Sequence, residues 1–344
     1  MKKYPIPTGY LFVDEYSEGE LETLSIGDYG KNKNVKADFL GYEDEIEGVP
    51  NAECMPLSDK WVVTLSTQYG CAMNCEFCDV PKVGYNGNAS FYDLKNQLLN
   101  ALDLFSDQVS YTNRLNIHYA RMGEPTFNDR VWKFSEWMIE KKSVLERVSG
   151  VSFETIHPVL STMAPKSVDN LENKLWDWCT TIKNGKYNGQ AGLQLSINST
   201  DSKQRDEMFN ERQTSLERLS KIGEELPYPV GRKYCLNFAL ASDYEVHAGY
   251  LRDLFDPERF MVKITPIHKN NSCRENDIET IDGYESYHPY KQAEEDLQRA
   301  GFDTIVFVPS IDEEDGLVTC GNAILSGSTP KTAEGKIKIK GIEK

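Results

Sequence analysis

The segment WVVTLSTQYGCAMNCEFCDV, residues 61–80, joins an apolar run to three closely spaced cysteines. Its first six residues are apolar and β-branched and predict a buried strand. Cys71, Cys75 and Cys78 follow within eight positions. A chain of 344 residues can bury a large apolar core, so it does not need cysteine cross-links for stability. We therefore expect three thiolates that serve chemistry at the end of this strand.

From Trp61 onward, short apolar runs alternate with longer amphipathic stretches, which indicates repeated βα units and a parallel sheet. The predicted strands cover residues 61–66, 114–120, 153–162, 192–199, 234–240, 260–268 and 303–310. The predicted helices cover residues 91–105, 129–142, 168–178, 215–226, 245–255 and 288–300. Six βα units are too few for a closed eight-stranded barrel. The predicted fold class is α/β, an open, partial (β/α)6 TIM-like barrel with an extra C-terminal strand.

The chain divides into one large core and two flanking segments. Residues 1–60 are acidic, with the charge runs DEYSEGELE and GYEDEIEG, and show no long periodic segment. We expect them to form an irregular or small-β N-terminal extension, with the charge runs in solvent. Residues 61–325 form the predicted barrel core with a C-terminal cysteine loop. Residues 326–344 are polar and lysine-rich and are expected to be a mobile tail.

The charge balance limits the classes of partner. The sequence has 54 Asp and Glu against 38 Lys and Arg, a net charge of -16 and a pI of about 4.9. Such a surface is poorly suited to a polyanion, although a local basic area could still bind one. The chain has neither an apolar segment of signal-peptide length nor the roughly 18 apolar residues of a membrane span. We therefore expect a soluble cytoplasmic protein with reduced thiols and no membrane partner.

The spacing Cys-x3-Cys-x2-Cys has three interpretations. The first is a structural zinc site, because thiolates in tight loops are common zinc ligands. Zinc needs a fourth ligand, but Cys54 stands alone 17 residues upstream and the chain has no second Cys-x2-Cys. The second interpretation is three unrelated buried cysteines, but their close spacing in the sequence argues against it. The third is an iron–sulfur cluster whose three thiolates leave one iron open for catalysis.

This spacing, just after the first strand of a βα series, resembles the radical S-adenosylmethionine superfamily. The resemblance implies a [4Fe-4S] cluster held by Cys71, Cys75 and Cys78, with S-adenosylmethionine (SAM) chelated at the open iron. It also implies that an electron from the cluster cleaves SAM and releases a 5′-deoxyadenosyl radical. Phe77 matches an aromatic residue that the superfamily often places before the third cysteine, where it could serve the cofactor or simply pack.

Two stretches resemble one subgroup, the dual-specificity RNA methyltransferases that methylate a ring carbon of adenosine. The loop STQYGCAMNCEFCDV, residues 66–80, is similar to the cluster loop of that group. Met122-Gly123-Glu124-Pro125 repeats most of its Gly-Met-Gly-Glu-Pro segment. The resemblance implies that Gly123 and Glu124 bind the cofactor, with the Glu124 carboxylate receiving the ammonium group of SAM. Taken alone, Glu124 could be a glutamate of a surface turn.

Further cofactor contacts are implied by the same resemblance. The stretches VLSTMAP and LQLSINSTD are similar to strand ends of the family, which implies cofactor-binding roles for Ser161, Ser196 and Asn198. ITPIH resembles an Ile-Pro-Phe-Asn segment, although His268 stands where that group has an asparagine. Each serine alone is an ordinary strand-end hydroxyl, but their order after successive strands favours a shared site.

The match most informative about the reaction is GFDTIVFVPSIDEEDGLVTCGNAI, residues 301–324, because Cys320 falls where the family keeps its methyl-carrying cysteine. Adenine ring carbons are not nucleophiles, so a sulfonium cannot methylate them directly. In the family the cysteine is methylated first, and the radical then activates its S-methyl group. Cys320 could instead be a small buried hydrophobic residue. EIEGVP resembles an Ile-Glu-x-Val segment, which implies that Glu47 is a candidate base.

Two features depart from the family pattern. Thr64, seven residues before Cys71, occupies the position of a second family cysteine, which helps to release the product by forming a disulfide. A hydroxyl cannot form a disulfide, so Cys54, Cys273 or a different final step would be needed. The family also has a helical RNA-binding domain before the barrel. Here an acidic segment of about 60 residues, without a basic helical unit, precedes Trp61.

The leading hypothesis is therefore methylation of an unactivated sp2 carbon through Cys320, on an adenine-like ring in RNA or in a smaller nucleotide-type molecule. The reaction would need an electron donor such as flavodoxin or ferredoxin. One alternative is a radical SAM enzyme that modifies a small metabolite without methyl transfer, with Cys320 as a hydrogen donor. Another alternative is a non-catalytic iron–sulfur or zinc protein that has kept the fold.

Overall fold

The computed structural model describes most of the chain. It covers residues 1–28, 54–281, 288–309, 311–330 and 337–342. The acidic run GYEDEIEG and the candidate base Glu47 lie outside the described residues. Among the helices in these ranges, none has both the length and the apolar composition needed to cross a membrane.

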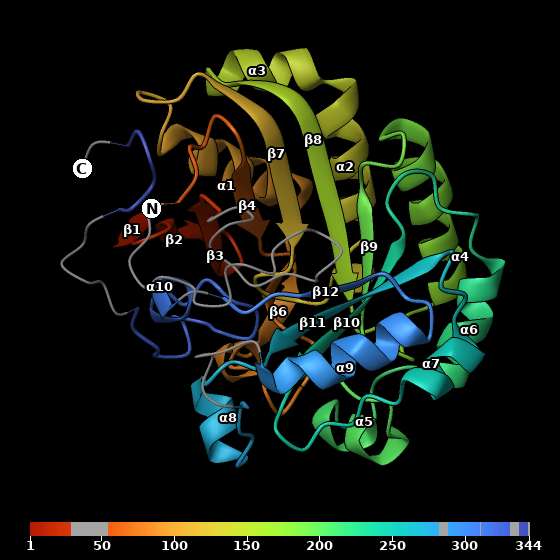
Figure 1. Ribbon diagram of the computed structural model, residues 1–344. Helices are drawn as coiled ribbons and strands as arrows, with labels where there is room; N and C mark the ends of the chain where they lie inside the picture. Colours follow the sequence, from red (N-terminus) through yellow and green to blue (C-terminus); the bar gives the residue numbers. More distant parts are fainter. Residues whose placement is uncertain (29–53, 282–287, 310, 331–336, 343–344) are drawn as a thin grey trace.

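One ten-stranded sheet, ordered β1-β2-β3-β4-β7-β8-β9-β10-β11-β12, forms the centre of the molecule (Figure 1). Its strands are β1 (Lys2–Ile6), β2 (Gly9–Tyr16), β3 (Gly19–Ile26), β4 (Trp61–Leu65), β7 (Tyr111–Tyr119), β8 (Ser152–Thr162), β9 (Gly192–Ser196), β10 (Tyr234–Leu240), β11 (Phe260–Pro266) and β12 (Thr304–Val306). From β4 to β12 all neighbouring strands are parallel and follow chain order. The strand order ends at β1 and β12, so the barrel is open. The predicted α/β partial barrel is confirmed.

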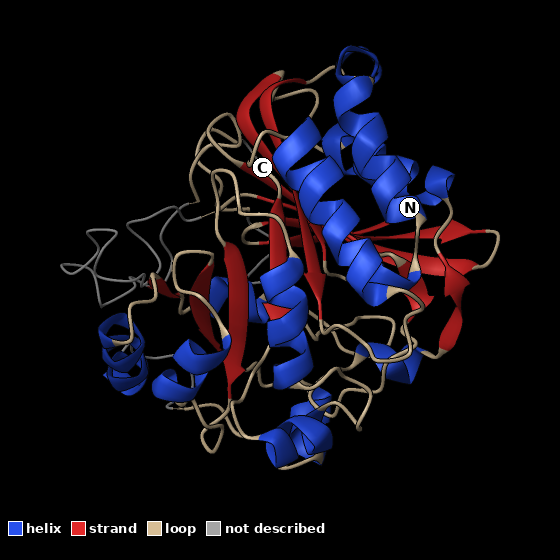
Figure 2. Ribbon diagram, turned by 90° about the vertical axis from the view of Figure 1, so that its right-hand side faces the viewer, coloured by secondary structure: helices blue, strands red, loops and turns tan. Residues whose placement is uncertain are grey.

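Helices connect the parallel strands and cover the outer face of the sheet (Figure 2). The helices between the strands are α1 (Phe91–Asp103), α2 (Arg130–Glu140), α3 (Lys142–Ser149), α4 (Leu171–Asp177), a π-helical segment (Trp178–Lys186), α5 (Ser202–Met208), α6 (Leu216–Glu225), α7 (Ala248–Leu254), α8 (Asn271–Glu275) and α9 (His288–Arg299), and α10 (Ile311–Asp315) follows the last strand. The outer strand residues are apolar because they pack against these helices. Tyr119 of β7, for example, is fully buried, and its hydroxyl lies 2.7 Å from that of Ser135 in α2.

The alternate side chains form the inner face of the sheet, which is largely polar. Its polar members include Thr64, Arg114, Asn116, His118, His157, Ser161, Gln194, Ser196, Asn237 and Lys263. In β10 and β11, buried and half-buried residues alternate strictly, and the half-buried residues face inward. The register agrees, because Asn237 of β10 pairs with Lys263 of β11. A polar inner face that stays partly exposed is suited to a ligand rather than to a dry core.

Of the two forms expected for the N-terminal extension, residues 2–26 adopt the small-β form. The strands β1, β2 and β3 make an antiparallel meander, and Leu24 of β3 pairs with Thr64 of β4. The run DEYSEGELE does not lie wholly in solvent, because Asp14 and Glu22 are buried. Both carboxylates have hydrogen-bond or ion-pair partners, which offset the cost of removing them from water. The meander thereby extends the barrel sheet.

The C-terminal segment differs from the expected mobile tail at residues 337–342. Ile339 is buried and forms an isolated parallel bridge with Cys54. The Lys338 ammonium lies 3.0 Å from the Asp312 carboxylate. Burial of apolar surface and this ion pair attach the segment to the rest of the protein.

Candidate active site

The three cysteines of the cysteine loop, residues 71–78, lie in the connection between the two strands of a small hairpin, β5 (Gln68–Gly70) and β6 (Tyr85–Asn88). All three thiols are free and half-buried. The hairpin holds the base of the loop, because the Cys71 N–H donates to the Gly84 carbonyl at 3.2 Å. Gly70 has φ +77°, and a Cβ there would lie 1.5 Å from the Gly84 oxygen. Only glycine permits this close approach.

The cysteine loop packs against an apolar cluster. Its buried members are Met73, Met163, Met208 and Phe209. The Cys75 sulfur lies 3.8 Å from the Met163 sulfur. The Phe77 ring packs edge-on against Phe209, with centroids 5.6 Å apart, which agrees with the packing role considered for Phe77.

The donor set fits an iron–sulfur cluster chemically, since thiolates are the usual ligands of such clusters. Burial raises the pKa of Cys71, Cys75 and Cys78, and repulsion between neighbouring thiolates raises the pKa of Cys75 and Cys78 further. In the described part of the chain, no group of three or more His, Cys, Asp or Glu residues is arranged to hold a metal ion. The fit therefore rests on donor chemistry and on charge, because a cluster would supply the positive charge that these thiolates lack.

Glu124 follows β7 at the C-terminal end of the barrel and is positioned by Gln68. Gly123 has φ +95°, and a Cβ there would lie 2.5 Å from the Gln68 side chain. Because Gly123 has no side chain, the Gln68 Oε1 can accept a hydrogen bond from the Glu124 N–H at 3.0 Å. Gln68 thereby links the hairpin below the cysteine loop to the carboxylate predicted to bind SAM.

The Glu124 carboxylate is 5% exposed and is oriented by local donors. Its Oε1 accepts from the Thr126 N–H at 3.1 Å and from the Thr126 hydroxyl at 2.7 Å, and its Oε2 accepts from the Met163 N–H at 3.0 Å. Burial raises the pKa of Glu124, and these hydrogen bonds oppose the rise. Within the described ranges, no Lys, Arg or His nitrogen lies within 4.0 Å of the carboxylate. A buried carboxylate without a cation is suited to binding an ammonium group.

Ser161 and Ser196 are half-buried at the C-terminal ends of β8 and β9. Their side chains lie on the inner face, where Ser161 pairs with Gln194 and Ser196 pairs with Asn237. Both serines therefore lie at the same end of the sheet as Glu124, the end at which parallel barrels bind their ligands.

Asn198 and His268 already have protein partners. Asn198 has φ +62°, and its Oδ1 accepts from the Ala239 N–H at 3.0 Å. This bond joins the end of β9 to β10. The His268 Nδ1 lies 2.9 Å from the Glu314 Oε2, which joins the end of β11 to α10.

The loop that carries Cys320 lies directly against the cysteine loop. The Asp79 N–H donates to the Gly321 carbonyl at 2.8 Å. The Asn270 Nδ2 group donates to the same carbonyl at 3.0 Å and to the Phe77 carbonyl at 2.8 Å. The residue after Cys320 is thus bonded to the residues around the third loop cysteine, although the two segments are far apart in the sequence.

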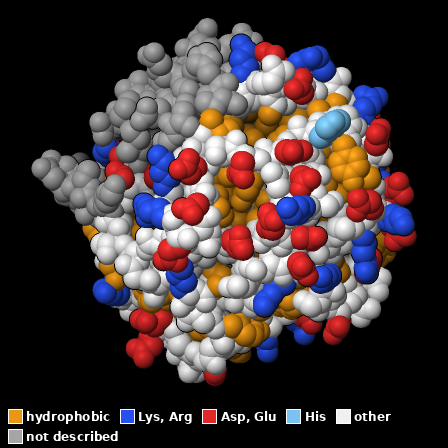
Figure 3. All heavy atoms as spheres, turned by 90° about the horizontal axis from the view of Figure 1, so that it is seen from below, with side chains coloured by type: hydrophobic (Ala, Val, Ile, Leu, Met, Phe, Trp, Pro, Cys, Tyr) orange, Lys and Arg blue, Asp and Glu red, His pale blue; other side chains and the backbone are white. Residues whose placement is uncertain are grey.

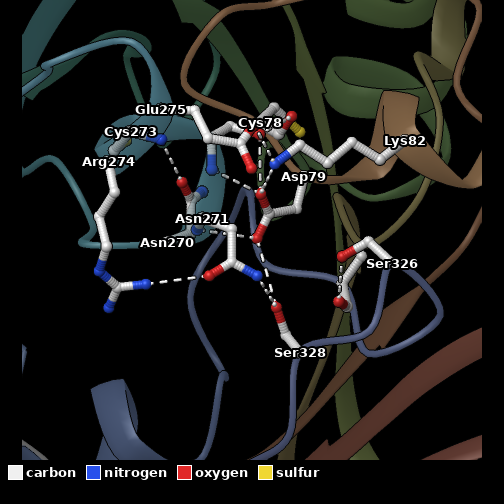
Figure 4. A network of polar contacts seen from close by, with 12 residues as sticks. Cys78, Asp79, Lys82, Asn270, Asn271, Cys273, Arg274, Glu275, Ser326 and Ser328 are labelled. Carbon is white, nitrogen blue, oxygen red and sulfur yellow. Dashed lines mark hydrogen bonds and ion pairs between the residues drawn. The ribbon is translucent and has the colours of Figure 1, made fainter.

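Asp79 is the centre of this contact (Figure 4). Its carboxylate is fully buried and accepts from the Ser272 N–H at 2.8 Å and from the Ser272 hydroxyl at 2.7 Å. The Lys82 ammonium lies 3.4 Å from the Asp79 carboxylate and 2.8 Å from that of Glu275. Asp79 therefore attaches the cysteine loop to the first turn of α8.

Cys320 is an exposed residue, and its thiol is influenced by the charged groups of the site. Partial removal from water raises its pKa, whereas Arg121 and Lys263 lower it by stabilising the thiolate. Glu124 acts in the opposite direction. The charge of Cys320 also raises the pKa of each thiol of the cysteine loop. The fold therefore brings the predicted methyl carrier, the cysteine loop and Glu124 together.

Arg121 connects the Cys320 loop to the N-terminal meander. Its Nη2 lies 2.7 Å from the Glu22 Oε2, and both side chains are almost fully buried. Its Nη1 donates to the Leu317 carbonyl at 2.7 Å, while the Glu22 Oε1 accepts from the Leu325 N–H at 2.8 Å. The ion pair thus holds both ends of the loop that contains Cys320.

Thr64, at the position of the family's second cysteine, lies on the inner face of β4 beside His118. Two other cysteines were candidates for its role. The Cys273 thiol donates to the Phe77 carbonyl at 3.6 Å, so Cys273 lies at the cysteine loop. Cys54 is fully buried in the segment that bridges to the C-terminal residues. Cys273 is therefore the candidate that adjoins the site.

Sequence reasoning missed the residues that hold the site together, namely Gln68, Asp79, Arg121 and Asn270. Their roles depend on contacts between segments that are distant in the chain. Two local signals exist. Gln68 lies in the lead-in that resembles the family's cluster loop, and Asn270 is a typical helix N-cap, whose side chain accepts from the Cys273 N–H at 2.9 Å.

The fold is similar to that of a solved radical SAM methyltransferase from Sphaerobacter thermophilus. The match has a TM-score of 0.56 and covers 93% of this chain and 81% of that chain. The sequence identity is 16%, so the similarity concerns the fold alone. The chain therefore has the fold of a radical SAM methyltransferase.

The sequence comparison points to a narrower group of proteins than the fold does. The dual-specificity RNA methyltransferase RlmN of Desulfosudis oleivorans is 26% identical over 229 residues, which are 64% of this chain and 54% of that protein. The RlmN of Helicobacter hepaticus is 29% identical over 155 residues, which are 44% of this chain and 36% of that protein. The chain thus spans about half the length of these relatives, or less. No family model matches the sequence. The predicted resemblance to the dual-specificity RNA methyltransferases is confirmed.

Proposed function

We propose that this protein is a radical SAM enzyme that methylates an unactivated sp2 carbon through Cys320. Cys71, Cys75 and Cys78 would hold a [4Fe-4S] cluster, and Glu124 would bind the ammonium group of SAM. The further SAM contacts would come from Gly123, Ser161, Ser196, Asn198 and His268. The similarity to the RlmN proteins and the geometry of the Cys320 loop support this assignment.

Bound at this site, the cluster and SAM would supply a 5′-deoxyadenosyl radical, with the electron coming from a donor such as flavodoxin or ferredoxin. Glu124 would fix the methionine part of SAM, because its carboxylate is buried, oriented by Thr126 and Met163, and lacks a basic partner within the described ranges. The hydroxyl groups of Ser161 and Ser196, on the inner face, would bind polar groups in the rest of the SAM molecule.

Cys320 would act as the methyl carrier. Its thiolate would attack the methyl group of one SAM, so that a new S–C bond forms while the sulfonium S–C bond breaks and leaves a neutral thioether. Arg121 and Lys263 would favour this step by stabilising the thiolate. The 5′-deoxyadenosyl radical would remove one hydrogen atom from this S-methyl group, and sulfur would stabilise the resulting radical on the adjacent carbon, which would add to a ring carbon that is not a nucleophile. Release of the product would then require the S–C bond to Cys320 to break, and Cys273, which lies at the cysteine loop, is the candidate to form a disulfide with Cys320 in that step.

One observation carries the proposal: the Asp79 N–H bonds the Gly321 carbonyl at 2.8 Å. A methyl carrier must lie beside the place where the radical is generated. Asn270 strengthens the same contact through two further hydrogen bonds. The residue after Cys320 is thereby held against the residue after Cys78.

The relatives are named for action on RNA, which favours an RNA substrate for this chain. Two features favour a smaller nucleotide-type molecule. The net charge is -16, and on the face at which the strands end many acidic side chains, interspersed with Lys and Arg, lie around the central apolar area (Figure 3). An excess of acidic side chains repels the phosphates of a polynucleotide more strongly than those of a small molecule.

A second candidate function is a radical reaction on a small metabolite without methyl transfer. Thr64 is the observation that favours it, because a hydroxyl on the inner face of β4 cannot form the disulfide of the family's final step. Cys320 would then donate a hydrogen atom from its thiol. In this case SAM would be cleaved while Cys320 stays unmethylated.

The test begins with anaerobic reconstitution by iron and sulfide, followed by reduction in the presence of SAM. We expect a brown protein, formation of 5′-deoxyadenosine and methionine, and a mass increase of one methyl group on the peptide that contains Cys320. Cys320→Ala should abolish both the methylated peptide and the methylated product. Cys179→Ala is the matched control, since Cys179 is buried away from the site.

Intact SAM together with a colourless, zinc-loaded protein would eliminate the radical function. SAM cleavage with a permanently unmethylated Cys320 would eliminate the methyl-transfer step and support the second candidate.

A further inference from the structure

The segment at the end of α5, residues 208–212, runs antiparallel to the cysteine loop and bonds every second residue of it. Both segments advance by two residues from one bond to the next, as neighbouring antiparallel strands do, although side chains make two of the three bonds. The bonded pairs are Met208 with Glu76, Asn210 with Asn74 and Arg212 with Ala72. The 208–212 segment therefore follows the loop over most of the stretch between its first and third cysteines.

Two of these bonds come from side chains, which can be replaced without changing the backbone. The Asn210 Nδ2 group donates to the Asn74 carbonyl, and the Arg212 Nη1 donates to the Ala72 carbonyl at 2.7 Å. Both acceptors lie between the first two cysteines of the loop. The backbone between these cysteines is thus held by donors from outside the loop.

The same segment also packs against the loop. Met208 and Phe209 are buried in the apolar cluster that contacts Cys75 and Phe77. Between them, a backbone bond runs from the Glu76 N–H to the Met208 carbonyl at 3.0 Å. The contact therefore combines burial of apolar surface with hydrogen bonds.

Arg205 of α5 holds the 208–212 segment from behind. This side chain is 1% exposed, and its guanidinium donates to the Ile197 carbonyl and, at 3.2 Å, to the Thr214 carbonyl. Asn210 and Glu211 have φ +51° and +56°, so two consecutive residues that are not glycine adopt the left-handed conformation. Such a conformation costs free energy and persists where surrounding contacts enforce it. The contacts with the cysteine loop and with Arg205 are of this kind.

Arg212 also brings a positive charge to the cysteine loop, because the carbonyl that it bonds belongs to the residue after Cys71. Among the described residues, no carboxylate oxygen lies within 4.0 Å of the Arg212 guanidinium. A [4Fe-4S] cluster held by three thiolates would be negatively charged, and its reduction would add one more negative charge. A cation at the loop therefore favours the reduced form.

We propose that the 208–212 segment positions the cysteine loop and that Arg212 raises the reduction potential of the cluster bound there. The segment holds the loop in one conformation before the cluster binds. Its residues touch the loop and not the reacting atoms, so Asn210 and Arg212 are positioning residues. The effect on the potential rests on the proposed function, whereas the support of the loop does not.

The first measurement is a redox titration of the reconstituted cluster at low ionic strength, followed by electron paramagnetic resonance without SAM. At one fixed potential, we expect Arg212→Gln to lower the ratio of reduced to oxidised cluster about three- to tenfold, because it removes the charge. Arg212→Lys keeps the charge and should restore the wild-type ratio. Arg147→Gln removes an exposed charge of α3, at the other end of the barrel (Figure 1), and should leave the ratio unchanged.

The second measurement is backbone hydrogen exchange in the protein without the cluster. Asn210→Gly removes the side-chain bond to the loop while glycine tolerates the left-handed conformation. We expect the peptide of residues 71–78 to exchange about fivefold faster or more, as for the loss of one hydrogen bond. Asn188→Gly is the matched control, because Asn188 is exposed and has φ +47°. The peptide that contains β10 reports on global stability in each variant.

A wild-type redox ratio in Arg212→Gln, or a loss that Arg212→Lys does not restore, would overturn the role of Arg212. Unchanged exchange of the loop in Asn210→Gly would overturn the role of the segment in positioning. Both results together, in a protein that binds the cluster and cleaves SAM, would reject only this inference. A wild-type protein that assembles no cluster would reject the proposed function and the role of Arg212 in reduction, while hydrogen exchange would still decide whether the segment supports the loop.

Discussion

The N–H of Asp79 donates to the carbonyl of Gly321 at 2.8 Å, which joins the residue after Cys78 to the residue after Cys320. The two loops come after β4 and β12, at opposite edges of the parallel part of the sheet, and this bond joins them beside both thiols. The Asp79 carboxylate is fully buried and accepts two hydrogen bonds from Ser272, which attach this contact to the first turn of α8.

Replacing Asn270 should separate methyl transfer from SAM cleavage. Asn270→Ala removes the two hydrogen bonds that join the loops and the N-cap of α8, at a cost of about 2–3 kcal/mol in the free energy of unfolding. We expect methylation of Cys320 to fall at least tenfold while SAM cleavage changes less. Asn173→Ala, at an exposed position of α4, is the control. An equal loss of both activities would argue against a positioning role.

Glu124→Gln should weaken SAM binding about tenfold or more. The substitution removes the charge that would pair with the ammonium group, in a place where burial strengthens electrostatic interactions. Equilibrium binding of SAM to the reconstituted protein is the measurement. Glu172→Gln, on α4 in an exposed pair with Arg218, should bind SAM normally. Unchanged affinity in Glu124→Gln would place the ammonium group elsewhere.

The barrel could be predicted from the sequence because each parallel strand is a compact apolar run. The predicted strand 61–66 is observed at Trp61–Leu65, and 234–240 is observed at Tyr234–Leu240. The N-terminal meander was harder to predict because β2 and β3 are buried on both faces and include the buried acid Glu22. Such strands lack the alternation of apolar and polar residues that identifies a half-buried strand.

The site was predictable where its residues are close in sequence or resemble a family segment. The three loop cysteines, Glu124 and Cys320 were named for these reasons, and the fold brings them together. The contacts of Arg121 with Glu22 and of Asn270 with Gly321 could not be predicted. They connect segments whose proximity is decided by the tertiary fold, and arginine and asparagine are common on surfaces.

Lys263→Met should make Cys320 less reactive at moderately alkaline pH. Lys263 stabilises the thiolate, so removing its charge raises the pKa of Cys320 further. The pH profile of iodoacetamide alkylation, followed on the peptide that contains Cys320, should shift to higher pH. Lys133→Met changes an exposed lysine of α2 and should leave the profile in place. A profile unaffected by Lys263→Met would show that this lysine is too distant to influence the thiol.

His157→Gln should reduce the loss of stability at acid pH. Burial, followed by the charges of Arg114 and Arg232, lowers the pKa of His157 from 6.5 to about 4. A histidine whose pKa is lower in the folded protein binds its proton more readily in the unfolded chain. Its contribution to the free energy of unfolding is therefore complete above pH 6.5 and is lost as the pH falls toward 4. For this shift in pKa, the free energy of unfolding falls by about 2–3 kcal/mol. Urea unfolding at pH 7 and pH 4.5 should therefore show a smaller difference in the free energy of unfolding for His157→Gln than for the wild type. An equal difference in the two proteins would contradict the prediction.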